Sequence, residues 1–232
     1  MGVGLRVHVS LGFVPTGMGR KETIMTEKRG PAYRVETERL VIRCWEPEDA
    51  ERLKDAIDAS LEHLRAWMPW ANDEPESVPE KMARLRMFRG RFDLDQDYVY
   101  AIYDREETQV LGGSGLHTRL GEDALEIGYW VRADQINQGY ATEASMALAR
   151  VAFEINEVAR VEIHCSPKNL ASASVPRKLG FTHEATLPRR GPEKDGVPVD
   201  SMIWAMHADQ YPGSPPSRIE LAAFGALGDR LL

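Results

Sequence analysis

One loop near the middle of the chain has residue types and spacing that suit anion binding. A β-rich run at 125–132 leads to Gln138-Gly139-Tyr140-Ala141, and apolar residues then recur at helical spacing at Ala144, Ala147, Leu148, Val151 and Ala152. Gly139 allows a tight turn before the predicted helix, whose first amide N–H groups have no partner inside the helix. These groups and the helix dipole attract negative charge. The loop therefore indicates a phosphate or pyrophosphate site, although it matches neither G-x-G-x-x-G nor G-x-x-x-x-G-K-[ST].

A second motif follows a predicted buried strand at 158–165. It reads Asn169-x-x-Ser172-x-x-Val175-x-x-Lys178-Leu179-Gly180-Phe181. Together with the loop, it resembles motifs A and B of the GNAT family, the GCN5-related N-acetyltransferases. The preceding segment, Glu126-Ile127-Gly128-Tyr129-Trp130, resembles the RimL/RimJ type, which acetylates protein N-termini. The resemblance covers residues 36 to 207.

The resemblance implies an α+β GNAT fold. Its central sheet would be mixed and mostly antiparallel, with about seven strands, flanking helices and a splay between the fourth and fifth strands. It also implies acetyl-CoA as the donor and direct attack by a primary amine in a ternary complex. Strand amides that pair with the pantetheine arm carry over to Trp130, Val131 and Arg132, with Val131 nearest the acetyl carbonyl. The remaining cofactor-binding positions are Asn137, Gln138, Gly139, Tyr140, Ala141, Thr142, Asn169 and Ser172.

The loop departs from the family pattern at one position. The usual motif is Gln/Arg-x-x-Gly-x-Gly/Ala, whereas Ile136 stands three residues before Gly139. Gln135 is displaced by one residue and is a candidate substitute. Because backbone amides do most of the anchoring, the departure bears on affinity for acetyl-CoA more than on its identity.

Acetyl transfer from a thioester to an amine needs a polarised carbonyl, a neutral amine and a partner for the departing thiolate. The resemblance makes Ser172 the candidate for that last role, on a helix capped by Asn169. Pro176 lacks the N–H that would pair with the Ser172 carbonyl. We therefore expect this carbonyl to accept a hydrogen bond from the cofactor or from water.

Two glutamates are candidate bases, acting directly or through water. Glu126 lies on the predicted fourth strand, and Glu193 lies in the last loop, where RimL-like proteins carry a glutamate. The alternative for Glu193 is an ordinary surface ion pair. We interpret His117 and His164 as strand residues with satisfied hydrogen bonds rather than as bases.

Trp67-Met68-Pro69-Trp70 places two indoles around a proline that must end a helix. One interpretation is a hydrophobic plug under the helix pair. The other is a wall of the acceptor pocket, since an indole offers a large contact area and one polar N–H. On the second interpretation Trp67, Trp70 and Glu126 bind the acceptor.

Composition excludes several classes of protein. A formal net charge of −7 argues against a nucleic-acid partner, which would need a basic surface, and the arginines at 84–91 fit a solvated helix face. Cys44 and Cys165 lie in apolar strand contexts and predict a reduced, cytoplasmic protein with neither a disulfide nor a metal site. No apolar run approaches the ~20 residues that span a bilayer, so no membrane partner is expected.

The pattern divides the chain into three parts: an N-terminal arm at 1–35 expected to be mobile, the acetyltransferase domain at 36–207, and a tail at 208–232. The apolar end of the tail, 219–232, is suited to a short helix. The tail is also a candidate clasp for a homodimer.

The sequence thus predicts an acetyl-CoA-dependent N-acetyltransferase acting on a primary amine. By resemblance, the first choice of acceptor is the N-terminal amine of a ribosomal or other protein. A small-molecule acetyltransferase, for an aminoglycoside, a polyamine or an aminoacyl-nucleotide antibiotic, is the alternative that Trp67 and Trp70 favour. A catalytically silent acyl-CoA-binding domain is the alternative that Ile136 suggests.

Overall fold

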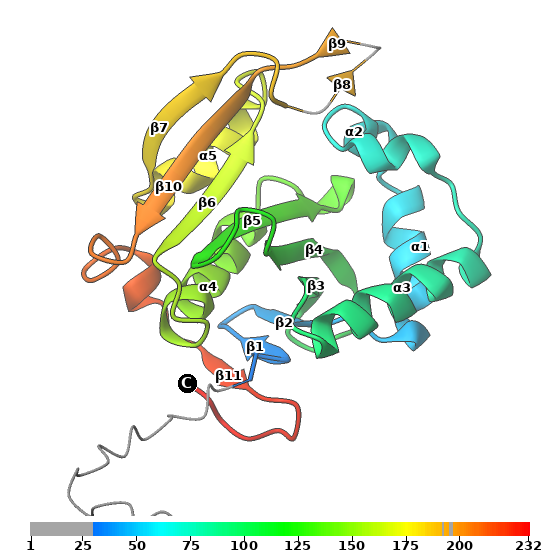
Figure 1. The fold of residues 1–232 in the computed structure, drawn as a ribbon. Coiled ribbons are helices and arrows are strands. Elements are labelled where there is room, and N and C mark those ends of the chain that lie inside the picture. The colour runs from blue at the N-terminus through cyan, green and yellow to red at the C-terminus, as the bar shows by residue number, and fades with distance from the viewer. Residues whose placement is uncertain (1–29, 192, 195–196) are drawn as a thin grey trace, which may run out of the picture.

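A mixed sheet crosses the whole molecule (Figure 1). The computed structural model describes residues 30–191, 193–194 and 197–232. The strands of the main sheet run in the order β11-β1-β2-β3-β4-β5-β6-β10-β7. Their bounds are β1 Arg34–Glu36, β2 Leu40–Cys44, β3 Tyr98–Asp104, β4 Val110–His117, β5 Ala124–Val131, β6 Arg160–Cys165, β7 Thr182–Leu187, β10 Ser201–His207 and β11 Ala222–Phe224. A separate hairpin consists of β8 Glu193–Lys194 and β9 Val197–Pro198.

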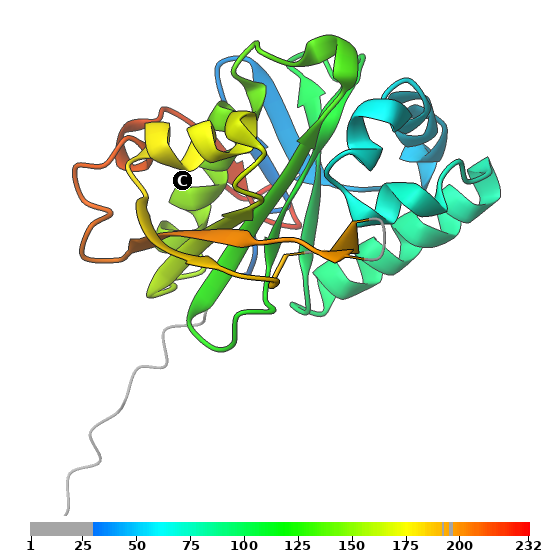
Figure 2. The ribbon, with the colours of Figure 1, turned by 90° about the horizontal axis from the view of Figure 1, so that it is seen from above.

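Helices cover both faces of the sheet, as Figure 2 shows from above. They are α1 Ala50–Asp58, α2 Leu61–Arg65, α3 Val78–Asp93, α4 Tyr140–Glu154 and α5 Leu170–Leu179, with short 3-10 turns at Pro47–Asp49, Pro69–Asp73, Ala133–Gln135 and Pro216–Arg218. Helices α4 and α5 pack on one face, and α1 and α2 pack on the other. On the sheet side of α4 the buried residues are mostly small, including Ala144, Ala147 and Ala152, so the helix can approach the sheet closely.

The predicted α+β architecture is confirmed, including the splay, although the main sheet of the described residues has nine strands instead of about seven. Within the sheet β5 and β6 are parallel, and their pairing covers only Ala124–Glu126 against Arg160–Glu162. Beyond that point β5 continues along β4 as far as Val131, whereas β6 follows β10 as far as Cys165. The two strands therefore separate after Glu126 and Glu162. They are the predicted fourth and fifth strands.

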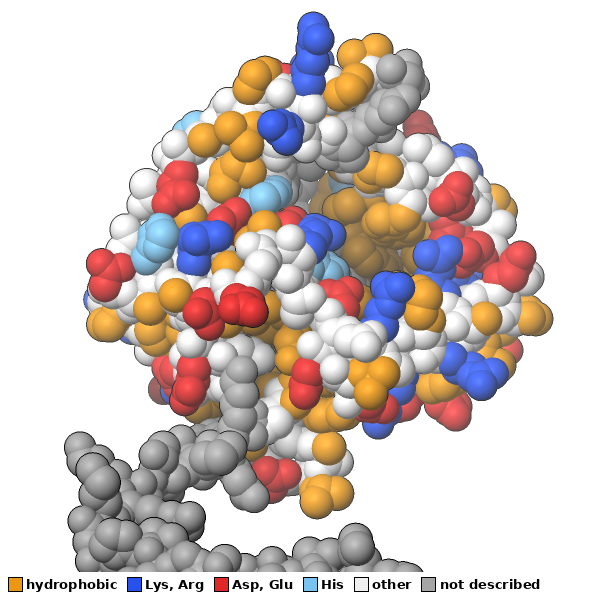
Figure 3. Space-filling model, in the orientation of Figure 1, with side chains coloured by type: hydrophobic (Ala, Val, Ile, Leu, Met, Phe, Trp, Pro, Cys, Tyr) orange, Lys and Arg blue, Asp and Glu red, His pale blue; other side chains and the backbone are white. Residues whose placement is uncertain are grey.

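A hollow opens on the face of the molecule shown in Figure 3. Hydrophobic side chains line it between the strands and the α1–α2 side, with histidine, acidic and basic side chains close to its edge. In Figure 1 the β8–β9 hairpin extends beyond β7 and β10 toward α2, on the same side. The splay and this hollow together define where a site can lie. Among the described residues, no helix is long and apolar enough to cross a membrane.

Two predictions about the organisation of the chain need correction. Residues 30–35, assigned to the mobile arm, belong to the fold: Ala32 is fully buried, and Tyr33 donates its N–H to Phe224 O at 2.8 Å. Residues 1–29 lie outside the described residues. The apolar tail forms strand β11 instead of a helix, because the edge of β1 offers it hydrogen-bond partners. Between α1 and α2 the chain turns at Ser60, whose hydroxyl donates to Ala56 O at 2.7 Å and accepts from Ala133 N at 2.9 Å.

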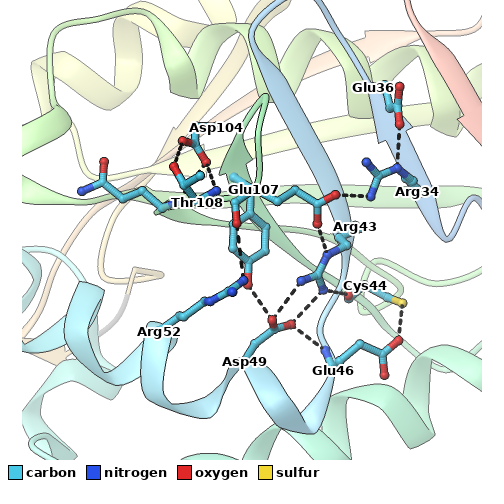
Figure 4. Close-up of polar contacts among 12 residues, drawn as sticks. Arg34, Glu36, Arg43, Cys44, Glu46, Asp49, Arg52, Asp104, Glu107 and Thr108 are labelled. Atoms are coloured by element: carbon cyan, nitrogen blue, oxygen red, sulfur yellow. Dashed lines mark hydrogen bonds and ion pairs between the residues drawn. The ribbon is translucent and has the colours of Figure 1, made fainter.

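A buried ion network fastens the α1 side to the sheet (Figure 4). Arg43 of β2 forms a two-pronged pair with Asp49, at 2.8 and 2.9 Å, and the Tyr103 hydroxyl donates to the same carboxylate at 2.7 Å. Burial acts to raise the pKa of Asp49. The bonds from Arg43, Glu46 N–H and Tyr103 outweigh it and hold that pKa below its usual value. Glu107 bridges Arg43 and Arg34 and extends the network to β1.

Candidate active site

One edge of β5 faces the splay and carries backbone amides that could pair with a ligand. The Arg132 N–H donates to Leu111 O of β4 at 2.8 Å, and Trp130 stands opposite Gly113 in the same ladder. Because N–H groups alternate along an antiparallel strand, the amides of Tyr129 and Val131 face the other way, toward the splay. Val131 thus lies as predicted. The Arg132 amide does not, because β4 takes it, and by the same alternation the Trp130 amide also faces β4.

The loop at 137–142 has the predicted form of an anion site. Gly139 has φ +86°, in the left-handed region, and occupies the N-cap of α4. The first hydrogen bond of the helix runs from Glu143 N to Gly139 O at 3.0 Å, so the amides of 140–142 precede the helical ladder. Asn137 also has a positive φ, +63°, and turns the chain into this position. These amides converge at the start of a fifteen-residue helix, with its dipole behind them.

Arg39 holds this loop from outside, which local sequence patterns did not reveal. Its guanidinium donates to Glu143 Oε2 at 2.7 Å and to Gln138 O at 3.0 Å, and lies 4.9 Å from the centre of the Tyr140 ring. The Thr37 hydroxyl donates to the same carboxylate at 2.6 Å. A cation therefore stands beside the loop in which Ile136 replaces the family's Gln or Arg. Ile136 itself is 41% exposed.

Gln135, the candidate substitute for the missing side chain, contacts the loop through Gln138. The Gln138 side-chain amide donates to Gln135 Oε1 at 2.9 Å. Gln135 thus orders the loop through this contact, and its role toward a ligand stays a prediction.

Ser172 lies on the opposite wall of the splay. Asn169 caps α5 as predicted, accepting from Ser172 N at 3.0 Å. The Ser172 carbonyl, which Pro176 leaves without a helical partner, accepts from the Tyr129 hydroxyl at 3.0 Å. This differs from the expected cofactor or water partner. The sequence did not indicate this contact, because Tyr129 and Ser172 are 43 residues apart.

A row of charged side chains crosses β5 and β6 on the face opposite Tyr129 and Ser172. Glu126 is buried, and Arg119 contacts both its oxygens, at 2.7 and 2.5 Å. Glu162, its neighbour in the parallel register, lies 2.5 Å from His164 Nε2 and accepts from Arg160 Nε at 2.6 Å. His164 Nδ1 is 3.7 Å from Glu126 Oε2. We call Arg119, Glu126, Arg160, Glu162 and His164 the charged row.

The two histidines have partners, as predicted. His117 lies 2.9 Å from Asp97, and His164 lies between the two carboxylates of the charged row. Of the two glutamates predicted as candidate general bases, Glu126 is the one that the structure places at the splay. Glu193 lies on β8, and its side chain is outside the described part of the chain.

The tryptophans meet in an arrangement that the sequence did not indicate. Trp70 packs edge-on against Trp130 of β5, with ring centres 6.1 Å apart. Gly113 makes room for this indole, because a Cβ there would lie 2.5 Å from Trp130 Nε1. Trp70 and Trp130 are both half-buried against the α1–α2 core, and Trp67 is half-buried at the end of α2. Trp70 therefore packs as the plug interpretation expects, and its ring contacts Trp130 of β5.

The arrangement offers hydrogen-bond donors for an anionic ligand and for a linear amide-bearing arm. The amides of the loop and those of Tyr129 and Val131 lead to the Ser172 hydroxyl, and the charged row and the indoles lie across the sheet from them. Within the described ranges, no group of three or more histidine, cysteine or acidic side chains is placed to hold a metal ion.

Comparisons with known proteins find similar sequences and similar folds. Residues 39–182 match the family model of the acetyltransferase (GNAT) domain. A putative ribosomal N-acetyltransferase YdaF of Bacillus subtilis is 30% identical over 168 residues, covering 71% of this chain and 86% of that protein. The [ribosomal protein uS5]-alanine N-acetyltransferase of Escherichia coli is 27% identical over 180 residues, covering 76% and 89%. The fold is also that of Mycobacterium smegmatis RimJ in complex with CoA-disulfide, with a TM-score of 0.69, 24% identity and coverage of 82% and 91%.

Proposed function

Because this chain belongs to the acetyltransferase (GNAT) family and is an acetyl-CoA-dependent N-acetyltransferase, we propose that its acceptor is the N-terminal amine of a ribosomal or other protein. The observation that carries the proposal is the likeness, at 27–30% identity, to relatives whose names specify ribosomal N-acetylation. The loop at 137–142, the Val131 amide and the Ser172 hydroxyl support the acetyl-CoA part of it, because they offer donors for a pyrophosphate, for an amide-bearing arm and for a departing sulfur.

The described residues fit acetyl-CoA. Gly139 would hold the pyrophosphate on the amides of 139–142, because its lack of a side chain leaves the helix start open and its positive φ sets the turn. Asn137 and Gln138 would add loop contacts. Arg39 supplies a positive charge at the loop, partly neutralised by Glu143. The amides of Tyr129 and Val131 would bind the arm and polarise the acetyl carbonyl.

The reaction balances without a redox partner or a metal. A C–N bond forms as the C–S bond breaks, the electron pair of the C–S bond stays on sulfur, the proton lost by nitrogen goes to a base, and the departing thiolate takes a proton from solvent. Ser172 would hydrogen-bond the developing thiolate. Glu126 would take the amine's proton, directly or through water, from the opposite face of the sheet.

Charge and kinship support a protein N-terminus as the acceptor. The chain has a formal charge of −7, which favours a cationic partner such as the basic end of a ribosomal protein. Relatives at 27–30% identity carry names that specify ribosomal proteins. Two free cysteines fit the reducing cytoplasm in which such an acceptor is made.

The test is release of CoA thiol from acetyl-CoA in the presence of defined amines. The panel comprises basic peptides beginning with Ala, Ser or Met, the same peptides with a blocked N-terminus, a polyamine and an aminoglycoside. We expect turnover with free N-terminal peptides and none with blocked ones, and mass spectrometry should place the acetyl group on the α-amine. Turnover confined to the polyamine or the aminoglycoside would overturn the assignment of the acceptor.

A further inference from the structure

Tyr129 connects the two walls of the splay through a contact that the proposed chemistry does not yet use. It lies on β5, and its hydroxyl is 3.0 Å from both the carbonyl oxygen and the hydroxyl oxygen of Ser172 on α5. Its side chain packs with the buried core on the α4–α5 side of the sheet. The contact is thus made across the sheet opening, beside the oxygen proposed to meet the sulfur.

The surroundings of Tyr129 favour a neutral hydroxyl that donates. Burial raises the pKa of Tyr129 above its ordinary value, so the hydroxyl stays protonated through the neutral range. Pro176 cannot supply an N–H to the Ser172 carbonyl, which makes this carbonyl an acceptor in need of a donor. Cys165 at the end of β6 also reaches Ser172, and burial raises the pKa of its thiol as well.

We propose that Tyr129 is a positioning residue for acetyl transfer, whose hydroxyl aims the Ser172 hydroxyl at the departing sulfur. The inference rests on the proposed function, in which Ser172 hydrogen-bonds the thiolate. Two hydrogen arrangements fit the same oxygen positions. In one, Tyr129 donates to the Ser172 carbonyl and accepts the Ser172 O–H.

In the second arrangement, Ser172 turns its O–H toward the sulfur and Tyr129 donates to Ser172 Oγ. The serine oxygen then stays hydrogen-bonded while its proton faces the negative charge, and a chain of two hydroxyls strengthens both bonds. No proton leaves either residue in this exchange. The only change is which acceptor each hydroxyl faces.

The chain offers a matched control for losing a buried tyrosine hydroxyl. Tyr100 of β3 is 1% exposed and donates to Ala32 O at 2.9 Å, on a strand remote from the splay. Tyr100→Phe and Tyr129→Phe each remove one hydroxyl bonded to a backbone carbonyl. A purely structural role for Tyr129 predicts the same consequences for both variants.

The first measurement needs no acceptor. CoA is bound to the protein and its thiolate is followed by ultraviolet absorbance against pH, with the CoA-free protein subtracted to remove Cys44 and Cys165. A hydrogen bond to the thiolate lowers the pKa of the bound thiol. We expect about a tenfold smaller thiolate fraction, at a pH below that pKa, in Ser172→Ala and in Tyr129→Phe, and no change in Tyr100→Phe.

The second measurement is turnover with acetyl-CoA and a basic peptide beginning with Ala. We expect kcat to fall about 100-fold in Ser172→Ala and about 10-fold in Tyr129→Phe, with KM for acetyl-CoA unchanged. The double variant should match Ser172→Ala alone, because Tyr129 acts through Ser172.

The outcomes separate the two proposals. If Ser172→Ala alters the bound thiol and Tyr129→Phe behaves like Tyr100→Phe, the positioning role is wrong and the proposed function stands. Additive losses in the double variant would also overturn it. If no acetyl transfer to the peptide occurs but Tyr129→Phe shifts the thiol as Ser172→Ala does, the positioning role stands and the acceptor assignment fails.

Discussion

At the splay, the two sides of the sheet offer different kinds of chemical group. On the α4–α5 side, the proposed binding groups are mostly backbone amides at the edge of β5 and in the loop at 137–142, together with Ser172 on α5. On the α1–α2 face, the groups are side chains brought together from separate elements: Trp70, Trp130 and the charged row. The backbone donors of the first side suit one kind of ligand. The side-chain contacts of the second side can be altered by single substitutions.

This difference bears on how the enzyme divides its tasks. Backbone donors keep their positions whatever the side chains are, so the proposed acetyl-CoA site depends on glycine geometry and helix placement. The proposed acceptor site depends on ion pairs and indole contacts, each of which a single substitution can remove. The following predictions test whether the two faces are independent.

The largest effect is expected at Gly139. Gly139→Glu places a carboxylate where the pyrophosphate would bind and forces a non-glycine residue to φ +86°. We expect acetyl-CoA affinity to fall more than about 100-fold, measured by calorimetry. Gly121→Glu is the matched control, because Gly121 also has a positive φ, +93°, with open space around it. Equal acetyl-CoA affinity in Gly139→Glu and wild type would show that the loop at 137–142 does not bind the pyrophosphate.

Glu126 tests the charged row. Glu126→Gln keeps the shape of the side chain and removes its basicity, so kcat/KM for the amine should fall about 100-fold while acetyl-CoA affinity stays constant. Glu162→Gln is the comparison, since Glu162 is equally buried and paired with Arg160 and His164. A larger loss of kcat/KM in Glu162→Gln than in Glu126→Gln would indicate that Glu162 and His164, and not Glu126, act as the base.

Trp70 tests the aromatic part of the same face. Trp70→Ala removes the edge-on contact with Trp130, and we expect KM for the acceptor to rise about 10-fold with little change in KM for acetyl-CoA. Trp70→Phe should restore most of the affinity. A rise in KM for acetyl-CoA alone would mean that Trp70 acts on the donor face through Trp130.

The smallest effect on either ligand is expected at Asp49, in the ion network of Figure 4. Asp49→Asn should lower the free energy of unfolding by roughly 1–3 kcal/mol at neutral pH, because Arg43 loses its buried partner, and leave both KM values unchanged. The folded-state pKa of Asp49 lies below its usual value, so its contribution is complete above that value and is lost as pH falls through the folded pKa.

Urea unfolding of wild type and Asp49→Asn across acidic pH checks this prediction. The difference between the two proteins should shrink as the medium becomes more acidic. A difference that grows in acid would contradict the assigned direction of the pKa shift.

Contacts between neighbours in the sequence were predictable. The turn at Gly139, the cap of α5 by Asn169 and the strand carrying Val131 follow from residues within one element or at its boundary. Hydrophobic periodicity and capping chemistry act over a few residues, so they remain visible in a linear pattern. The short apolar tail was ambiguous for the same reason, because three strand residues and one turn of helix look alike in sequence.

Contacts between distant segments were not predictable. Arg39 meets Glu143, 104 residues away, and Tyr129 meets Ser172, 43 residues away. The Arg132 amide is taken by β4 because of the register of the strands, which no local pattern specifies. The pairing of Trp70 with Trp130 likewise depends on the gap that Gly113 leaves in β4.

The sequence by itself determined the family of this protein, the loop that would hold the pyrophosphate and the strand that would hold the pantetheine arm. These features rest on backbone conformation, which local residue types set. Only the tertiary structure decided which amides of that strand face the splay, what holds Ser172, and which charged and aromatic side chains lie across from it. Those answers depend on strand register and on packing between elements far apart in the chain, where each side chain finds its partner only after the sheet has formed.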